Sequence, residues 1–574
     1  MSGTPTWFGS ASHPLLGWIH QPPSAKVRGA VVICPPFGME FASTYATLRV
    51  LADRLAQEGL LAMRFDYAGT GDSAGDYREP GQLDRWLDSV AEAVAYVRAA
   101  GAPTVSIVGL RMGALLAVHA LPRCGPVSQL VLWDPCVSGN AYLREQSSLY
   151  RLKVGPGEPE TPDALTPGMV FSPDTVTDLR ALDLTDAEIS RAQVTTTLLM
   201  PRPQRARDAA IVAIAGRPDV EVVEAAEQVG LIDVPSQDAA VPHATVAAIT
   251  DYLAQAATSA VTFTECKLSD EAVVAVTPEG QSIVERFDRV GPRGLFAITT
   301  VTDDLAGPTI VCVSQANAHR VGPARLWPEM ARAAAARGIR TVRYDRRSVG
   351  GSPADDEAVR RFTRGTGRAD AADGATLSAY SDEAVEDLAD VVTATGPDPS
   401  MLALVGVCSG AWVATVAAAA DVRPHSVYLV NLGVWRRRPP PGAMLQLPAG
   451  QLPAEQTAAD EQAPPALGVL RNRVRRLVPY ALRLSRGRFG SAQVPELLLA
   501  PVVKRGTAVT LLFAPWDAAN FEQVWGLPAV PRLKRRGALS LVVDPLIEHS
   551  LVSRAGRDLV GRRVVDEVAA LAGR

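Results

Sequence analysis

Cysteine is scarce in this chain, and its spacing excludes the usual structural roles of cysteine. The six cysteines stand at positions 34, 124, 136, 266, 312 and 408, with no C-x-x-C pair and no Cys/His cluster of metal-ligand spacing. A disulfide framework is not expected in 574 residues with so few thiols, so we predict a reducing, cytoplasmic setting. We predict no metal and no cofactor, since G-x-G-x-x-G and G-x-x-x-x-G-K-[ST], the glycine patterns that bind nucleotide phosphates, do not occur.

Long apolar runs and an excess of charge of one sign are also missing. The formal net charge is -4 at pH 7, so no basic surface for nucleic acid is predicted. No run of about 18 apolar residues occurs, so no transmembrane helix is predicted. The first residues, MSGTPTWFGSASHPLLGW, lack the basic and apolar regions of a secretory signal.

What the chain does contain is an internal repeat. The segment VVICPPFGMEF…GLLAMRFDYAGTGDS (31–73) aligns with IVCVSQANAHR…GIRTVRYDRRSVGGS (310–352) at an offset of 279 residues. Further on, VSIVGLRMGALLAV (105–118) aligns with LALVGVCSGAWVAT (402–415) at an offset of 297. Both halves therefore alternate short apolar strands with helical stretches, which is typical of βαβ units and a mostly parallel sheet.

The repeat predicts two tandem α/β domains, each with a mostly parallel sheet flanked by helices. We place them at residues 1–258 and 259–574, because the repeats meet after the helical stretch HATVAAITDYLAQAA. The stretches 140–192 and 433–500 have poorer periodicity and follow a late strand in each half, where a lid insertion is expected. The change of offset indicates a surface insertion near 355–378 in the second half.

One short motif points to nucleophilic chemistry. In LVGVCSGAWV an apolar run ends at Gly406, and Cys408 and Gly410 follow before an Ala-rich stretch. A strand–turn–helix elbow of this kind exposes the central side chain at the turn, and the next backbone N–H groups, beginning with Ser409, can stabilise an oxyanion. The helix N-terminus also favours a thiolate. We predict that Cys408 is a nucleophile; the alternative interpretation is a buried cysteine at a Gly-flanked strand end.

A nucleophile of this type needs a base and an acid further along the chain. His549 lies between a predicted strand and a predicted helix, where the base is expected, whereas His425 begins a strand. Asp517 follows the apolar run TAVTLLFAPW and is the predicted acid. Asp544 is the second choice, since it also stands at a strand end.

The loop after an early strand of the second half should supply a second oxyanion donor. Here the loop is Ser-Gln-Ala-Asn, and we expect the backbone N–H near Gln315 to serve. His319 follows in the same loop, where two roles are open, contact with substrate or support of the loop by hydrogen bonds.

The first half has an equivalent elbow, GLRMG, with Arg111 in the nucleophile position. Arginine stays protonated and is neither a nucleophile nor a base at neutral pH. We therefore expect no independent hydrolase in this half. Arg111 either binds a carboxylate or phosphate of a substrate, or marks a degenerate site kept for packing.

A further stretch, RNRVRRLVPYALRLSRGR (471–488), combines seven arginines with apolar residues. It fits docking of an acidic carrier protein or an anionic lipid surface, but we favour a solvated lid helix with a proline kink.

Both halves resemble α/β-hydrolases of the serine-aminopeptidase-like group. The first half is similar to the exosortase A system-associated hydrolase 2 group, through CPPFGMEF (34–41), RFDYAGTGDS (64–73), GLRMGA (109–114) and LWDPCVSGNAYLRE (132–145). That group also has an Arg in its elbow. The resemblance implies an α/β-hydrolase fold without a nucleophile in this half.

The second half resembles hydrolase 1 and related enzymes of natural-product gene clusters. The matching segments are HRVGPARLW (319–327), GVCSGA (406–411) and EHSLVSRAGRD (548–558), and those relatives also carry Cys in the elbow. Two departures from the family pattern stand out, RRSVGGS in place of a G-x-G-D-S ending, and Glu548 where Asp often precedes the His.

Together these features predict a cysteine-dependent acyl-transfer enzyme that acts on an ester or thioester, carrier-bound or free, through an acyl-Cys408 intermediate. The resemblance places such an enzyme in natural-product or exopolysaccharide metabolism. Two alternatives remain open. One is a simple hydrolase, such as an esterase, thioesterase or peptidase, and the other is a non-catalytic binding or scaffold protein.

Overall fold

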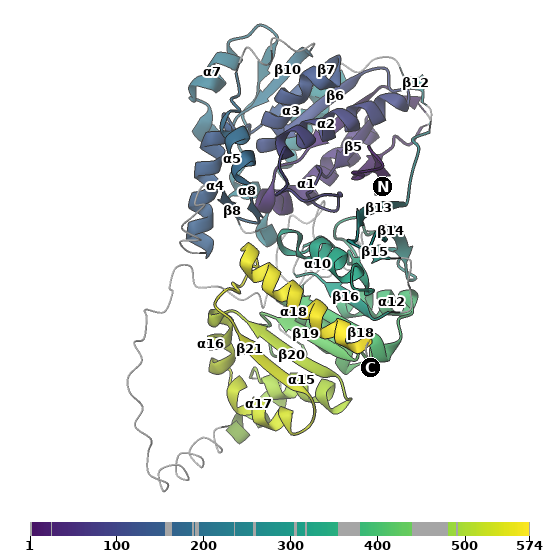
Figure 1. The fold of residues 1–574 in the computed structure, drawn as a ribbon. Helices are drawn as coiled ribbons and strands as arrows, with labels where there is room; N and C mark the ends of the chain where they lie inside the picture. Colours follow the sequence, from purple (N-terminus) through teal and green to yellow (C-terminus); the bar gives the residue numbers. More distant parts are fainter. Residues whose placement is uncertain are drawn as a thin grey trace.

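The computed structural model shows two sheets that follow one another along the chain (Figure 1). It describes residues 3–24, 26–154, 164–185, 189, 194–234, 236–255, 260–263, 265–302, 307–315, 318–353, 379–438, 480–488 and 492–572. The insertion predicted at 355–378 and the greater part of the lid predicted at 433–500 lie outside these residues.

The first sheet has eight strands and is mostly parallel. Only its first two strands run antiparallel to their neighbours. In spatial order the strands are β1 (Thr4–Phe8), β2 (Leu15–His20), β5 (Leu60–Phe65), β4 (Gly29–Cys34), β6 (Val105–Leu110), β7 (Val127–Trp133), β10 (Val194–Met200) and β11 (Val220–Val222).

The second sheet has nine strands and repeats this arrangement after one extra antiparallel strand at its edge. In spatial order the strands are β13 (Glu271–Val276), β14 (Ser282–Val290), β15 (Leu295–Val301), β17 (Arg340–Tyr344), β16 (Thr309–Val313), β18 (Leu402–Val407), β19 (Ser426–Val430), β20 (Ala508–Phe513) and β21 (Leu539–Val543).

The two sheets have the same topology. When β13 is set aside, the strands of both sheets stand in the spatial order 1-2-4-3-5-6-7-8, counted along the chain. The segments that repeat in the sequence become equivalent strands, so β4, β5, β6 and β7 correspond to β16, β17, β18 and β19. The predicted α/β class with two mostly parallel sheets is therefore confirmed.

Helices cover both faces of each sheet, because the buried parallel strands are apolar on both sides. On the first sheet, α2 (Gln82–Ala99) and α3 (Met112–Cys124) pack on one face, and α1 (Gly38–Gln57) and α9 (His243–Gln255) on the other. On the second, α12 (Asp382–Thr395), α13 (Ser409–Ala419), α15 (Pro495–Lys504) and α17 (Gly526–Lys534) face α10 (Leu326–Ala335) and α18 (Arg554–Ala572) across the sheet.

Shorter elements connect these layers. In the first half they include α4 (Gly139–Val154), the hairpin of β8 (Leu165–Thr166) and β9 (Met169–Val170), α5 (Pro173–Arg180), α7 (Ala209–Ala215) and α8 (Val229–Ile232). In the second half, α16 (Pro515–Gln523) follows β20 directly. None of the helices in the described part of the chain is both long and apolar enough to span a membrane.

The chain passes from one half to the other along the surface of the first half. The strand β12 (Val261–Thr262) pairs with β3 (Lys26–Val27), and the Tyr96 hydroxyl donates to the backbone carbonyl of Lys267. The expected boundary at 258/259 falls within residues 256–259, which are outside the described part. The exact division of the chain stays a prediction.

The two halves share an apolar and ionic junction. Trp18 of β2 packs edge-on against Phe296 of β15, with ring centroids 4.8 Å apart, inside a cluster to which both halves contribute. Gly351 lies under the same indole, and a Cβ there would come within 2.0 Å of Trp18. This contact explains why the second half departs from the G-x-G-D-S pattern at this position.

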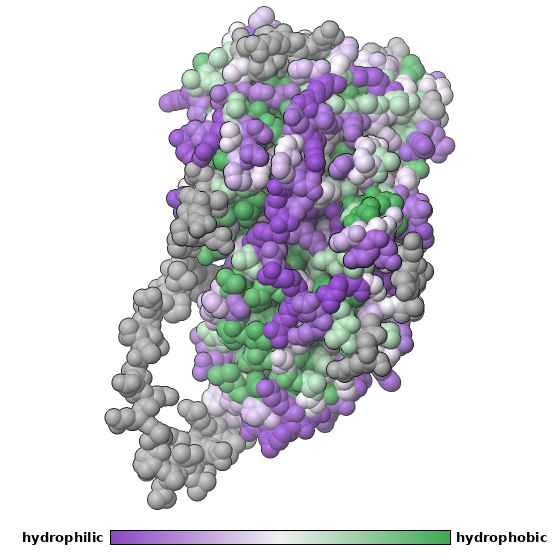
Figure 2. All heavy atoms as spheres, viewed as in Figure 1, coloured by the Kyte–Doolittle hydropathy of each residue, from purple (hydrophilic) through white to green (hydrophobic). Residues whose placement is uncertain are grey.

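On the face shown in Figure 2, a band of hydrophilic side chains crosses the junction without a break.

Candidate active site

Cys408 lies at a sharp turn between β18 and α13. Its backbone has φ 51° and ψ -114°, a conformation that a non-glycine residue adopts only under strain. The glycines on either side permit the turn, because a Cβ at Gly406 would lie 2.4 Å from the Gly410 carbonyl oxygen, and one at Gly410 would lie 2.2 Å from the Val313 carbonyl oxygen. The local geometry is that of the strand–turn–helix elbow expected from the motif.

Cys408 is also the most accessible cysteine of the chain. It is half-buried, while the other five cysteines are buried. Burial raises the pKa of all five of those thiols, that of Cys266 to about 11 and those of the other four further. Cys408 is therefore the thiol best placed to react with a molecule from solution.

The structure brings His549 and Asp517 together beside Cys408. His549 Nδ1 lies 2.9 Å from Oδ1 and 3.0 Å from Oδ2 of Asp517, whose side chain is fully buried at the start of α16. A carboxylate only accepts hydrogen bonds, so Nδ1 carries a proton and Nε2 is left to exchange one with the Cys408 thiol. Asp544, the second choice for the acid, accepts instead from the backbone N–H of Leu546.

Asn431, at the end of β19, connects the segments that carry the acid and the histidine. Its amide nitrogen donates to the backbone carbonyls of Glu548 and His549 at 3.0 and 3.2 Å, and its oxygen accepts from the N–H of Ala514 at 2.8 Å. The Glu548 carboxylate accepts from the N–H groups of Leu551 and Ser553, so it shapes the histidine loop from within. Asp517 rather than Glu548 is thus the carboxylate next to the imidazole.

The charge of His549 is governed by these neighbours. Burial alone disfavours the imidazolium, but hydrogen bonds to Asp517 and Cys408 and the negative charge of both raise the pKa of His549 to about 10. The Trp516 ring stands edge-on to the imidazole at 5.8 Å and limits its movement. These contacts favour the imidazolium form of His549.

Tyr380 is a site residue that the sequence did not reveal. Its hydroxyl lies 3.9 Å from Cys408 Sγ, and its ring packs edge-on against Trp412, one turn into α13. Burial, followed by the nearby Cys408, raises the pKa of the Tyr380 phenol well above its usual value, so the hydroxyl keeps its proton and can donate to the sulfur. No motif includes Tyr380, which directly precedes the N-cap Ser381 of α12.

The two expected oxyanion donors lie on neighbouring elements. Ser409 is the first residue of α13, and Gln315 follows Ser314 at the end of β16, which contacts Gly410. Ser314, Ser409 and Tyr344 line one small cavity together with Arg346. A carbonyl oxygen placed there would face the N-terminus of α13, where the helix dipole favours negative charge.

His319 does not lie in this cavity. It is buried at the junction, stacked on Tyr45 of the first half at 4.1 Å and edge-on to Phe41 at 5.6 Å. Burial and the neighbouring Arg320 lower the pKa of His319 to about 4, so the ring is neutral. These contacts support the structural role of His319, and a contact with substrate stays a prediction.

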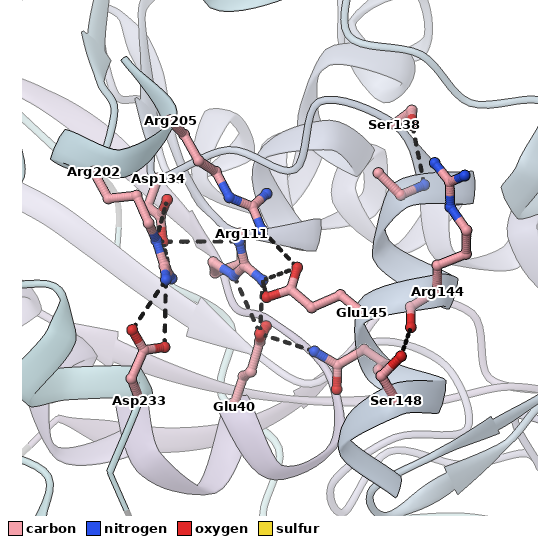
Figure 3. Close-up of polar contacts among 12 residues, drawn as sticks. Glu40, Arg111, Asp134, Ser138, Arg144, Glu145, Ser148, Arg202, Arg205 and Asp233 are labelled. Atoms are coloured by element: carbon pink, nitrogen blue, oxygen red, sulfur yellow. Dashed lines mark hydrogen bonds and ion pairs between the residues drawn. The ribbon is translucent and has the colours of Figure 1, made fainter. Parts of the chain in front are cut away.

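Arg111, for which substrate binding and a degenerate packing site are both open predictions, contacts carboxylates of this chain. Like Cys408, Arg111 has a positive φ, 57°, at its elbow, but its side chain is fully buried. Its guanidinium donates to Glu40 Oε1 at 3.0 and 3.1 Å and to both oxygens of Glu145 at 3.0 Å (Figure 3). The carboxylates that Arg111 binds therefore belong to this chain.

A second layer of charges completes the Arg111 cluster. Asp134 lies 3.8 Å from Arg111 and pairs with Arg202 at 2.6 Å, while Arg205 pairs with Glu145 at 2.6 Å (Figure 3). Burial alone would lower the pKa of Arg111, but the negative charges of Glu40, Asp134 and Glu145 outweigh it and raise that pKa well above its usual value. The position of the nucleophile in this half is thus filled by an internal ion-pair network.

The described part of the arginine-rich stretch lies at a separate cavity. Arg483 and Arg486 line it together with Arg436, Gln493 and Trp525. Docking of a carrier protein at this stretch stays a prediction.

Within the described residues, no group of three His, Cys, Asp or Glu side chains could hold a metal ion.

Comparison with known proteins finds one family match and several solved structures with similarity. The family model described as "Serine aminopeptidase, S33" matches residues 25–158 of the first half. Solved structures with similarity include Est1E from Butyrivibrio proteoclasticus with bound ferulic acid, at 14% identity over 43% of this chain and 98% of that chain (TM-score 0.32). A proline iminopeptidase from Mycobacterium smegmatis has 13% identity over 44% of this chain and 98% of that chain (TM-score 0.32). No curated protein matches the sequence.

A soluble variant of monoglyceride lipase from Saccharomyces cerevisiae, crystallised with a substrate analogue, has 12% identity over 45% of this chain and 97% of that chain (TM-score 0.32). The family match and the strand order of both sheets give the chain an α/β-hydrolase fold. The narrower resemblance to exosortase-associated hydrolases stays a prediction.

Proposed function

We propose that this protein is a cysteine-dependent acyl-transfer enzyme that acts on an ester or thioester. The catalytic domain would span residues 259–574, and residues 1–258 would form a hydrolase-like domain without a nucleophile. The observation that carries the proposal is the contact of His549 with both Asp517 and Cys408 at a strained elbow.

In the proposed reaction the proton of Cys408 Sγ already resides on Nε2 of His549 before the substrate is attacked, while Asp517 holds Nδ1–H. The thiolate attacks the acyl carbonyl, and the oxyanion is stabilised by the N–H groups of Ser409 and of the chain near Gln315. The carbon–heteroatom bond then breaks, and the His549 imidazolium gives its proton to the departing alcohol or thiol. The product of this half-reaction is an acyl thioester on Cys408.

The second half-reaction reverses these roles. Nε2 of His549 takes a proton from an acceptor alcohol or amine, which attacks the acyl-Cys408 carbonyl and releases the thiolate. A thiol suits this exchange, because its acyl thioester has nearly the same free energy as a thioester donor, such as an acyl group on a carrier protein. We therefore favour transfer over hydrolysis.

Hydrolysis is the second candidate function, with water as acceptor. The side chain of His549 is 20% exposed, so water can reach the imidazole that would activate it. Such an enzyme would use the same residues and the same acyl-Cys408 intermediate.

Intact-protein mass spectrometry tests the proposal. Wild type, Cys408→Ala and Cys312→Ala are incubated with a panel of acyl thioesters, with and without amines and alcohols. Cys312 is the matched control, since it is a buried cysteine of β16 in the same half. The expected result is a mass gain in wild type and Cys312→Ala, absent in Cys408→Ala and discharged by one class of acceptor.

Other outcomes decide between the alternatives. A mass gain that water alone discharges would favour the hydrolase. Absence of a gain with every donor, together with a Cys408 thiol that alkylates no faster than free cysteine, would contradict the enzyme and favour a binding protein.

A further inference from the structure

Two loops of the second half flank Cys408, and both lie against the first half. One follows β16, carries Gln315 and ends at Arg325; we call it the oxyanion loop. The other precedes α18 and carries His549 within residues 544–553; we call it the histidine loop. Neither loop contains a strand in its described residues, so other contacts must fix its position.

The oxyanion loop is held mainly by arginine. Arg325 is buried in a left-handed conformation (φ 71°) and donates to three backbone carbonyls of the first half, those of Gly71, Ser73 and Gly75, at 2.8 to 3.1 Å. Arg320 pairs with Asp72 at 2.7 Å, in the same turn of the first half. These arginines tie the loop to one turn of the first half, residues 71–75, and the stacking of His319 on Tyr45 adds a second attachment.

The histidine loop is tied to the first half by one guanidinium. Arg557, in the first turn of α18, is buried and donates through Nη1 to the carbonyls of Val552 and Leu551 at 2.7 and 3.4 Å. Its Nη2 reaches the first half, at 3.5 Å from the Tyr77 hydroxyl and 3.4 Å from the carbonyl of Gly168. Figure 1 shows the start of α18 directed at the first half.

The carbonyls of Gly168 and of residues 71–75 come from the first half's own loops. Gly168 lies in the turn of the β8–β9 hairpin, within the stretch where the sequence predicts a lid. A buried guanidinium that loses its acceptors costs free energy, so these arginines fix the distance between each loop and the first half. Misplacement of a reacting group by about 1 Å can lower a rate by about 100-fold.

We infer that the first half positions the loops of the Cys408 site, and that Arg325 and Arg557 are the positioning residues through which it acts. Arg325 sets the oxyanion loop, and Arg557 sets the histidine loop. This inference rests on the proposed function, because it assigns the two loops their catalytic roles.

Two readouts in the full-length chain separate the roles. Acylation of Cys408 by an acyl thioester needs both the oxyanion donors and His549, whereas alkylation by iodoacetamide needs the thiolate but no oxyanion donor. Arg325→Lys is expected to lower the acylation rate about 10- to 100-fold and to leave the alkylation rate within about 2-fold. Arg557→Lys is expected to lower both rates and to move the pH dependence of alkylation to higher pH.

Two first-half variants repeat the test without a change in the second half. Tyr45→Leu removes the ring that stacks on His319 of the oxyanion loop, and Tyr77→Phe removes one acceptor of Arg557. Each should give the same pattern as its arginine counterpart, with a smaller effect. The control Tyr252→Phe removes a hydroxyl that donates to Thr196 within the first half at 2.8 Å, and it should change neither rate.

Three outcomes would overturn the inference. Equal losses of acylation and alkylation in Arg325→Lys and Tyr45→Leu would indicate a general loss of structure, and unchanged rates in all four variants would mean that the loops hold themselves. A wild-type chain that is neither acylated nor rapidly alkylated would overturn the proposed function itself, and this inference with it.

Discussion

Nδ1 of His549 lies 2.9 Å from the fully buried Oδ1 of Asp517, although 32 residues separate the two along the chain. Asn431 supports this contact from both sides. It donates to the backbone carbonyls of Glu548 and His549, and it accepts from the backbone N–H of Ala514, three residues before Asp517. Because the carboxylate is buried and the imidazole half-buried, the charge of each controls the other. This pair therefore leads to a prediction about pH.

Asp517→Asn should destabilise the protein in a pH-dependent way. The pKa of His549 is raised from an ordinary 6.5 to about 10, so the stabilisation by its imidazolium is fully present below pH 6.5 and lost as the pH rises through 10. The variant should lose roughly 2 kcal/mol of unfolding free energy at pH 6 and much less at pH 10.5. Urea unfolding of both proteins at the two pH values measures this, and an equal loss at both would contradict it.

Tyr380→Phe tests the hydroxyl beside the sulfur. Without the phenol that can donate to a thiolate, we expect acylation of Cys408 to slow about 5-fold, equivalent to one modest hydrogen bond. Alkylation by iodoacetamide should also require a higher pH. Tyr428→Phe, which alters a buried tyrosine on β19 of the same half, is the control. An unchanged alkylation profile would mean that Tyr380 only packs.

Arg111→Leu tests the internal ion-pair network of the first half. The substitution leaves the buried Glu40 and the neighbouring Glu145 without their shared cation, at a cost of roughly 3–5 kcal/mol of unfolding free energy. Arg123→Leu, which removes a partly exposed arginine paired with Asp84 and Asp88, should cost roughly 0–1 kcal/mol. Comparable losses in urea unfolding would show that the buried cluster stabilises no more than a surface pair.

His319→Phe should make the protein more resistant to acid. The folded-state pKa of His319 is lowered to about 4, so its neutral form contributes stability that is present above pH 6.5 and lost as the pH falls toward 4. Wild type should lose roughly 2–3 kcal/mol more than the variant between pH 7 and pH 4. His20, whose pKa is also lowered to about 4, is present in both proteins and cancels in the comparison. Parallel melting temperatures across this pH range would refute the prediction.

The sequence predicted those features that depend on local spacing. The glycines around Cys408 and Arg111 mark turns where a Cβ would collide with the backbone, so the motif specifies the turn almost alone. The repeat likewise predicts two similar, mostly parallel sheets, and equivalent segments do form equivalent strands in both, whereas the strand order comes from the structure.

Other features depend on contacts between distant segments, which leave no spacing in the sequence. Arg111 meets carboxylates of its own chain that lie 71 and 34 residues away. Tyr380 reaches Cys408 from a segment without a motif. The pairing of Asp72 with Arg320 and Arg343 likewise joins the two halves through residues whose separate motifs predict no such contact.

The network around Arg111 also bears on how the first half could change in evolution. A single substitution of Arg111 by serine or cysteine would place a hydroxyl or thiol at the elbow, but it would leave the buried Glu40 without its cation and Glu145 with Arg205 alone. A working nucleophile would then need at least three coordinated replacements, with unstable proteins at each intermediate step. Single substitutions in the Arg111 network are therefore expected to be selected against. Selection can act on the surface of the first half and on its junction with the second half, while Arg111, Glu40 and Glu145 stay unchanged.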